Sequence, residues 1–199
     1  MKIGLKAFLF VSVSMVWITG CNKEPVVAYG KVDNTPYETK ECLRELACGG
    51  EIDKSLLADR IVVYKEKHIM HLYRKGKKVE EFRISLGKNG TKGDKIEKGD
   101  YRTPIGDYTI VRKKCDNRLY KSLMISYPNE SDISEARKRG VEPGGYITIH
   151  GQPKWNADGR GDKYTLAYDW TEGCIAVTNR AMDILWKSIE NGAKIEIYS

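Results

Sequence analysis

Short apolar runs rich in β-branched and aromatic residues, separated by charged pairs and glycine turns, recur from about residue 60 to the end. Glu66-Lys67 and Lys75-Gly76-Lys77 fit hairpin turns between the first three runs. The pattern predicts a mainly β domain. The runs expected to form strands are Ile61–Tyr64, His68–Tyr73, Val79–Leu86, Tyr108–Arg112, Leu123–Tyr127, Tyr146–His150 and Lys194–Tyr198.

Two segments of this domain change to a helical pattern. Asp132–Glu135 has the form of a capping box and predicts a short helix that ends at Gly140. Thr178 or Asn179 can cap a second helix, which Gly192 is expected to end. Its apolar residues follow helical spacing: Met182, Leu185, Trp186 and Ile189. The predicted fold is therefore mainly β, with two short α-helices.

The first twenty residues have the features of an export signal. Lys2 and Lys6 precede an apolar run, Ala7–Ile18, that is too short to span a bilayer comfortably. Ile18–Cys21 resembles a bacterial lipobox, in which Cys21 becomes the acylated first residue. We therefore expect residues 1–20 to be a lipoprotein signal peptide. The alternative is an ordinary secretion signal that happens to precede a cysteine. Both place the mature protein outside the cytoplasm, and lipid would anchor it to a membrane face.

Residues 21–58 are expected to be a tether with some local structure. The segment begins polar and contains Pro25 and Pro36, whereas Thr39–Ala47 is compatible with a helix. On a helix, Cys42 and Cys48 would be about 9 Å apart along the axis, too far for a disulfide. A bond from either cysteine to Cys115, or a 42–48 bond in a non-helical turn, stays open, because export allows disulfides.

Charge and histidine placement argue against two classes of function. The chain has 34 Lys and Arg against 27 Asp and Glu, and loss of the leader lowers the net charge from +7 to +5. No basic helix with interleaved aromatic residues indicates nucleic-acid binding. His68 and His71 are three apart on a predicted strand, so they face opposite sides and do not form a joint metal site.

The clearest candidate chemistry joins His150, at the end of a strand, to Cys174, at the start of an apolar run. A thiol attacks a carbonyl as thiolate and needs a base beside it. Gly173 leaves room for substrate near backbone N–H groups that can stabilise an oxyanion. A buried structural cysteine with a packed histidine is the alternative. A zinc hydrolase lacks a third ligand at recognisable spacing, so we expect no metal or cofactor.

The motifs around this pair resemble the L,D-transpeptidase (YkuD-type) catalytic domain. Thr148-Ile-His150-Gly151 and Thr171-Glu-Gly-Cys174-Ile match its His-Gly and Ser/Thr-x-Gly-Cys signature. Further matching blocks are Ser85–Gly87, Gly99–Gly106 and Ser126–Asn129. The resemblance covers about residues 59–199 and implies a β-sandwich of the L,D-transpeptidase type.

The resemblance also implies roles for individual residues. Cys174 would be the nucleophile acylated by a peptidoglycan stem peptide, His150 the base and proton donor, and the Gly151 carbonyl the group that orients the imidazole. Thr171, Glu172 and Gly173 would form the oxyanion environment. Attack by an amine gives a crosslink or an attached lipoprotein, whereas attack by water gives cleavage. The motif leaves both open. Transpeptidation is preferred because most of the family is described so, with an idle wall-binding module as a third alternative.

One residue departs from the family pattern. Many members have arginine two residues after the cysteine, and this chain has Ala176. Asp169-Trp170 and Cys174–Val177 instead resemble the branch containing the enzyme that cleaves the murein–lipoprotein link, which makes murein lipoprotein a further candidate partner. Other cations would have to bind the substrate carboxylate, and Trp155 and Trp170 are candidates for lining the groove. The candidate cations are Arg102, Lys154 and Arg160.

Overall fold

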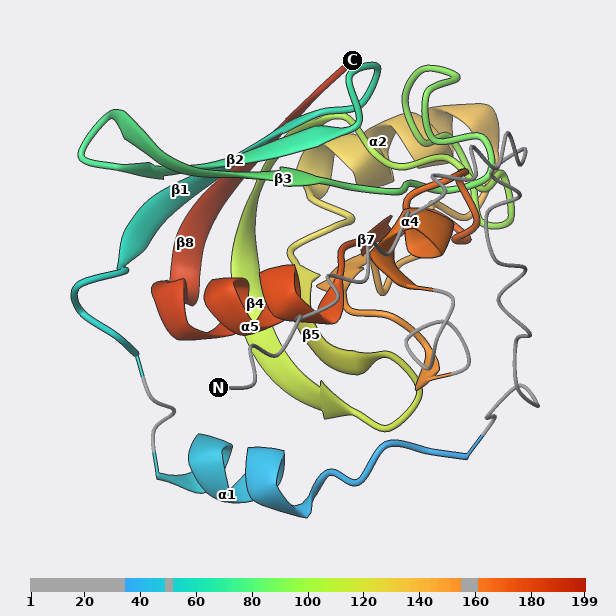
Figure 1. The fold of residues 1–199 in the computed structure, drawn as a ribbon. Helices are drawn as coiled ribbons and strands as arrows, with labels where there is room; N and C mark the ends of the chain where they lie inside the picture. Colours follow the sequence, from blue (N-terminus) through green and yellow to red (C-terminus); the bar gives the residue numbers. More distant parts are fainter. Residues whose placement is uncertain (1–34, 49–51, 155–160) are drawn as a thin grey trace, which may run out of the picture.

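The computed structural model describes residues 35–48, 52–154 and 161–199, which form one curled sheet with short helices around it (Figure 1). The eight strands lie in the order β3-β2-β1-β8-β4-β5-β6-β7. This confirms the predicted mainly β fold. The strands are β1 Ala58–Tyr64, β2 Ile69–Arg74, β3 Lys77–Arg83, β4 Gly106–Asp116, β5 Tyr120–Ile125, β6 Thr148–His150, β7 Ile175–Ala176 and β8 Ile189–Tyr198.

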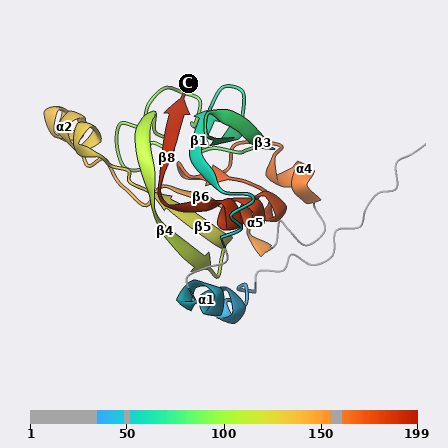
Figure 2. The ribbon, with the colours of Figure 1, turned by 90° about the vertical axis from the view of Figure 1, so that its left-hand side faces the viewer.

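The long strand β4 joins the two halves of this sheet. Gly106–Thr109 pair with β8, and Ile110–Asp116 pair with β5, with an irregular register after Ile110. The sheet turns along β4, so β5 and β6 lie below the plane of β1 and β8 (Figure 2). Two neighbouring pairs are parallel, β1 with β8 and β6 with β7. The second of these pairs carries the candidate site.

The described residues contain four helices: α1 Lys40–Ala47, α2 Glu130–Arg139, α4 Gly161–Thr165 and α5 Asn179–Ser188. Thr178 caps α5 as predicted, and the expected apolar face of α5 is buried. Gly192 does not end this helix, because α5 stops at Ser188 and β8 begins directly at Ile189. Gly192 lies within β8 with a φ of +89°. Helix α4 lies in the connection between β6 and β7.

The start of α2 differs from the prediction, whereas its end agrees with it. Asn129, not Asp132, is the N-cap: its side chain accepts the Asp132 N–H at 3.0 Å, and the Asp132 carboxylate accepts the Asn129 N–H at 2.8 Å. The capping box therefore begins three residues earlier than expected. Gly140 closes the helix in the left-handed conformation, with a φ of +69°.

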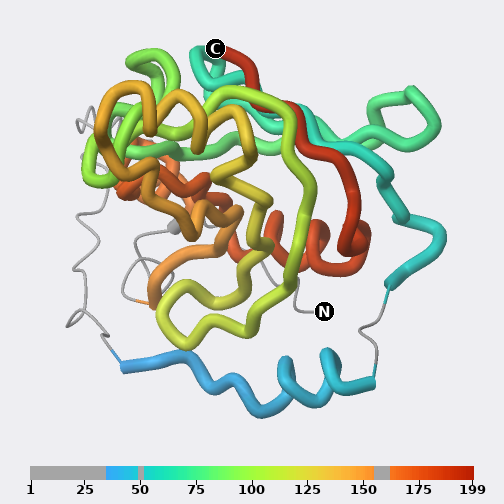
Figure 3. The backbone as a smooth tube through the Cα atoms, turned by 180° about the vertical axis from the view of Figure 1, so that it is seen from behind, coloured from blue at the N-terminus to red at the C-terminus, as the bar shows by residue number. Residues whose placement is uncertain are grey.

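Part of the predicted tether is folded against the domain. Helix α1 occupies most of the helix-compatible stretch, and Cys42 forms a disulfide with Cys115 at the end of β4. Cys48 is free and exposed. In the view from behind, residues 35–48 run below the β4–β5 turn (Figure 3). The predicted leader and Cys21 lie outside the described residues. Among the described residues, no helix has the length and apolar character needed to cross a membrane.

A buried lysine holds the loop between β3 and β4. Lys65 is fully buried, and its ammonium group donates to the carbonyls of Gly93 at 2.7 Å and Thr103 at 2.6 Å. A second cation, Lys95, pairs with Asp100 at 2.6 Å within the same loop. Burial lowers the pKa of Lys65 to about 8, with Arg102 adding to the effect and nearby aspartates opposing it.

We expect wild type to gain stability over Lys65→Met as pH rises. Between pH 8 and the ordinary lysine pKa, the unfolded chain binds a proton that the folded chain has lost, so alkali favours folding. The difference in unfolding free energy should shift toward wild type by roughly 2 kcal/mol between about pH 7 and about pH 10. Denaturant titrations at both pH values measure it, with Lys77→Met on exposed β3 as the surface control. A difference that stays constant with pH would contradict the prediction.

Candidate active site

His150 is the last residue of β6 and is buried, with 2% of its surface exposed. Its Nδ1 lies 2.8 Å from the carbonyl oxygen of Gly151. A carbonyl only accepts, so Nδ1 carries the proton and Nε2 keeps its lone pair in the neutral ring. The ring of Trp170 meets the imidazole edge to face at 5.6 Å between centroids. The imidazole is therefore fixed on two sides.

Cys174 directly precedes β7, and the parallel pairing of β7 with β6 places it beside His150. Ile149 is opposite Ile175 and His150 is opposite Ala176, so Thr148 faces Cys174. Side chains two residues apart on a strand share a face, which places Thr148, His150 and Cys174 on the same face. The Thr148 hydroxyl donates to the thiol sulfur at 3.5 Å. The thiol in turn lies 3.7 Å from the carbonyl oxygen of Tyr146.

These surroundings favour the thiolate of Cys174. Burial, the largest single influence, raises the pKa of the thiol, but hydrogen bonding and charge from His150, with help from Thr148, outweigh it. The net result is a pKa below the ordinary cysteine value. A thiolate paired with an imidazole is the reactive form of a cysteine nucleophile.

The turn before the cysteine is held by the side chain of Thr171. Its hydroxyl donates to the Cys174 carbonyl at 2.7 Å and accepts the Gly173 N–H at 3.2 Å. The Thr171 N–H donates to the Leu86 carbonyl at 3.1 Å. Gly173 has a φ of +129°, and a Cβ there would lie 2.8 Å from the Arg102 carbonyl. Glycine is therefore required at this position.

Cys174 opens onto a groove of about 760 Å³ between the loop after β3 and the segment before β6. Tyr101 and Tyr146 are exposed on its walls. Both charge signs are present, with more basic than acidic side chains. The charged lining residues are Lys95, Lys98, Arg118, Glu142 and Glu172. The groove therefore offers partners for the carboxylates and amines of a peptide.

The predicted substrate-binding residues are mostly placed elsewhere. The guanidinium of Arg102 donates to the Asp94 carbonyl at 3.1 Å, and the Lys154 ammonium donates to the Thr35 hydroxyl at 2.7 Å. Trp170 packs on His150 and donates its indole N–H to the Thr165 carbonyl at 3.1 Å, so it supports the site from behind. Trp155 and Arg160 lie outside the described residues. The sequence pattern does not single out Thr148, Lys98 or Arg118.

The position of the missing arginine is enclosed. Ala176 has no exposed surface and is hydrogen-bonded through its backbone to Ser85, with N–O distances of 2.8 and 2.9 Å. The neighbouring Asp169 carboxylate accepts the Leu86 N–H at 2.8 Å and lies 3.0 Å from His68 Nε2. His71 instead pairs with Glu81. Within the described ranges, no group of three or more His, Cys, Asp or Glu side chains could hold a metal ion.

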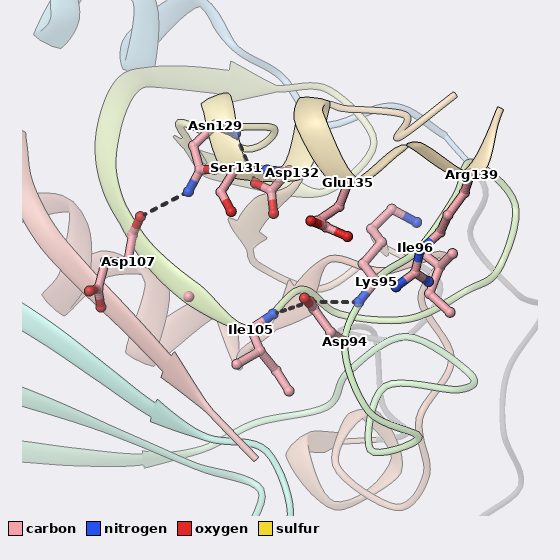
Figure 4. A pocket seen from close by; sticks show the side chains of 11 residues that line it. Asp94, Lys95, Ile96, Ile105, Asp107, Asn129, Ser131, Asp132, Glu135 and Arg139 are labelled. Carbon is pink, nitrogen blue, oxygen red and sulfur yellow. Dashed lines mark hydrogen bonds between the residues drawn. The ribbon is translucent and has the colours of Figure 1, made fainter. Parts of the chain in front are cut away.

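A second cavity, of about 340 Å³, lies between α2 and the loop that Lys65 supports (Figure 4). Burial raises the pKa of Asp132 at the start of that helix. The charged residues lining this cavity are Asp94, Lys95, Asp107, Asp132, Glu135 and Arg139. Since it contains neither the thiol nor the imidazole, the groove at Cys174 is the better candidate active site.

Comparison with known proteins agrees with this fold. The chain belongs to the L,D-transpeptidase catalytic domain (YkuD) family, whose model matches residues 58–197. Putative L,D-transpeptidase YafK of Escherichia coli K12 is 30% identical over 135 residues, covering 65% of this chain and 46% of that protein. The crystal structure of the helical cell shape determining protein Pgp2 from Campylobacter jejuni has a TM-score of 0.53 at 27% identity, covering 71% of this chain and 48% of that one. The chain spans about half the length of these relatives.

We expect His150→Gln to raise the pKa of the Cys174 thiol. The variant loses the group that outweighs burial, and burial alone raises the pKa above the ordinary cysteine value. The pH at which Cys174 is half as reactive as its maximum should therefore move upward by roughly one unit or more. Iodoacetamide labelling over a pH series, read on the Cys174 peptide by mass spectrometry, measures this. Labelling of exposed Cys48 is the internal control, and an unchanged Cys174 midpoint would refute the assignment.

Proposed function

We propose that the chain is a cysteine acyl-transferase that acts on peptidoglycan stem peptides. The observation that carries the proposal is the thiol of Cys174, with a lowered pKa, on the same strand face as His150 and at the mouth of a groove. Membership of the L,D-transpeptidase family and the likeness to YafK support the reaction class.

The proposed acylation step uses the two side chains in turn. The Cys174 thiolate attacks a stem-peptide carbonyl and forms a tetrahedral intermediate. His150, protonated by the thiol, returns the proton to the leaving amine as the C–N bond breaks. A thioester on Cys174 and a free amine result. The Gly151 carbonyl stabilises the imidazolium by accepting from Nδ1 at 2.8 Å.

The oxyanion of the intermediate would form beside the turn that precedes Cys174. The N–H groups of Thr171 and Gly173 already have acceptors in the free protein. We therefore assign oxyanion donation to the N–H of Cys174. The hydroxyl of Thr171 and the open backbone of Gly173 shape the turn, and Glu172 lies within it. Each such donor contributes about 3–4 kcal/mol in a well-studied protease.

The second half-reaction decides the product. An acceptor amine that gives its proton to His150 produces an L,D-crosslink or an attached lipoprotein, and the thiolate leaves. Water at the same place instead hydrolyses the thioester, and the net result is cleavage of the stem peptide or of a murein–lipoprotein link. We propose transpeptidation as the principal outcome, with hydrolysis as the alternative outcome of the same acyl-enzyme.

Stem-peptide carboxylates would bind the cations on the groove walls. Lys98 and Arg118 line the groove. Lys98 lies 4.0 Å from the carboxylate of Glu142 in an exposed pair, whereas Lys95 is held by Asp100 at 2.6 Å in a buried one. We propose that Lys98 and Arg118 bind the substrate carboxylate, the role for which the sequence suggests Arg102 and Lys154. Ala176 has no exposed surface, so in this proposal its side chain does not contact the peptide.

The proposed place of work is the bacterial cell envelope. A lipoprotein signal at residues 1–20 and acylation of Cys21 would tether the catalytic domain, residues 59–199, to a membrane face outside the cytoplasm. From there it would crosslink or remodel the wall. Because the similar protein Pgp2 is a helical cell shape determining protein, cell shape is a phenotype to examine.

Incubation with a defined disaccharide-tetrapeptide tests the proposal. We expect a covalent adduct of the acyl fragment in the intact mass of wild type, absent from Cys174→Ala, together with dimers containing a 3–3 bond. Cys48→Ala is the matched control because it removes the other described free thiol and leaves the groove intact.

A parallel incubation with lipoprotein-linked muropeptide separates the two outcomes. Released lipoprotein without dimers would establish the hydrolase. Absence of any adduct that depends on Cys174, with muropeptide and with a carbapenem, would overturn the enzyme and favour a wall-binding module.

A further inference from the structure

The peptide group between Gly151 and Gln152 holds the imidazole of His150. Its carbonyl accepts from His150 Nδ1 at 2.8 Å, and its N–H donates to Asn179 Oδ1, also at 2.8 Å. Because a peptide group is planar, the direction of its N–H determines the direction of its C=O. The side chain of Asn179 therefore determines where the carbonyl that holds His150 points.

The amide of Asn179 is itself oriented by Tyr37. The Tyr37 hydroxyl donates to the Gln152 carbonyl at 3.0 Å, so only its lone pairs remain for Asn179, whose Nδ2 donates to it at 3.1 Å. With Nδ2 turned to Tyr37, Oδ1 faces the peptide group. Gly151 packs tightly against this amide, since a Cβ there would lie 2.5 Å from Oδ1.

Tyr37 comes from outside the family domain, which begins at residue 58. The segment that carries it is held to the β4–β5 hairpin by the disulfide between Cys42 and Cys115. The Tyr37 N–H donates to the Asn117 carbonyl at 2.7 Å, and its ring meets that of Tyr120 at 5.4 Å between centroids. The N-terminal segment thus places one hydroxyl beside the groups that hold His150.

We infer that Asn179 and Tyr37 are positioning residues for His150, acting through the Gly151–Gln152 peptide group. Their effect on acyl transfer rests on the proposed function, whereas their effect on the thiol of Cys174 does not. A carbonyl held toward Nδ1 stabilises the imidazolium, and the imidazolium stabilises the thiolate. Loosening the peptide group therefore raises the pKa of the thiol and slows acylation without touching the substrate.

Four variants of the full chain separate orientation from packing. Asn179→Leu keeps similar bulk and loses both hydrogen bonds, whereas Asn179→Asp keeps an acceptor for the Gln152 N–H. Tyr37→Phe loses only the hydroxyl. Tyr198→Phe is the matched control, because it removes a tyrosine hydroxyl that contacts Glu196 near the C-terminus. The readouts are the pH midpoint of Cys174 alkylation, kcat and KM with the tetrapeptide, and the melting temperature.

For Asn179→Leu we expect kcat to fall roughly tenfold, about the effect of one lost hydrogen bond, with KM unchanged. Its alkylation midpoint should rise by roughly half to one pH unit. Tyr37→Phe should lower kcat roughly threefold and should also raise the alkylation midpoint. Asn179→Asp should recover most of the Asn179→Leu loss, and Tyr198→Phe should match wild type.

Unchanged alkylation midpoints in Tyr37→Phe and Asn179→Leu would overturn the inference. So would a loss in Asn179→Asp as large as that in Asn179→Leu. If wild type forms no Cys174-dependent adduct with either muropeptide or with a carbapenem, the proposed function fails, and the alkylation midpoints still decide the positioning role. If Asn179→Leu fails to fold, the alkylation midpoints of Tyr37→Phe and Asn179→Asp test the inference in its place.

Discussion

The parallel pairing of β6 with β7 is the constraint on which the candidate site depends. Strand β7 is two residues long, yet its register places Cys174 opposite Thr148 and on the face that carries His150. So short a pair is held from both sides. Ser85 bridges to Ala176 on the far edge, and the β5–β6 ladder fixes the near edge. A slip of one residue would turn the thiol to the opposite face. Close packing around β7 therefore keeps the thiol on the same face as His150.

The groove beside this pair is bordered by a loop that owes its shape to buried charge. Lys65 ties two carbonyls of the loop together, and Lys95 with Asp100 closes it from within. Burying an ammonium group is costly, and apolar side chains would fill the same volume at less cost. Two charge-assisted hydrogen bonds from one ammonium group, however, fix positions that apolar contacts leave adjustable. The loop reaches the site through Gly87, where a Cβ would lie 2.9 Å from Gly173. The loop therefore packs directly against the turn before Cys174.

Local sequence patterns predict the strands and contain the family motif, but they do not predict the contacts between distant segments. Alternating and β-branched runs identify most strands because each reports on its own burial. Gly192 is wrongly predicted to end a helix, since a left-handed glycine serves a strand irregularity equally well. Lys65 gives no signal of burial, because its acceptors are carbonyls, which have no side-chain code. Tyr37 falls within the predicted tether because the partners of its hydroxyl lie 115 and 142 residues away in the sequence. The family motif identifies His150 and Cys174, whereas the bonds that orient them depend on tertiary structure.

Ala176 changes how the imidazole and the substrate can interact with charge. Its side chain is enclosed on the face shared by Cys174 and His150, directly opposite the histidine in the ladder. An arginine at this position would bring a permanent cation toward the imidazole and disfavour the imidazolium. With alanine, two neutral groups contact the imidazole of His150, the Gly151 carbonyl and the edge-to-face ring of Trp170. The cations proposed for an anionic substrate, Lys98 and Arg118, lie instead on the groove walls.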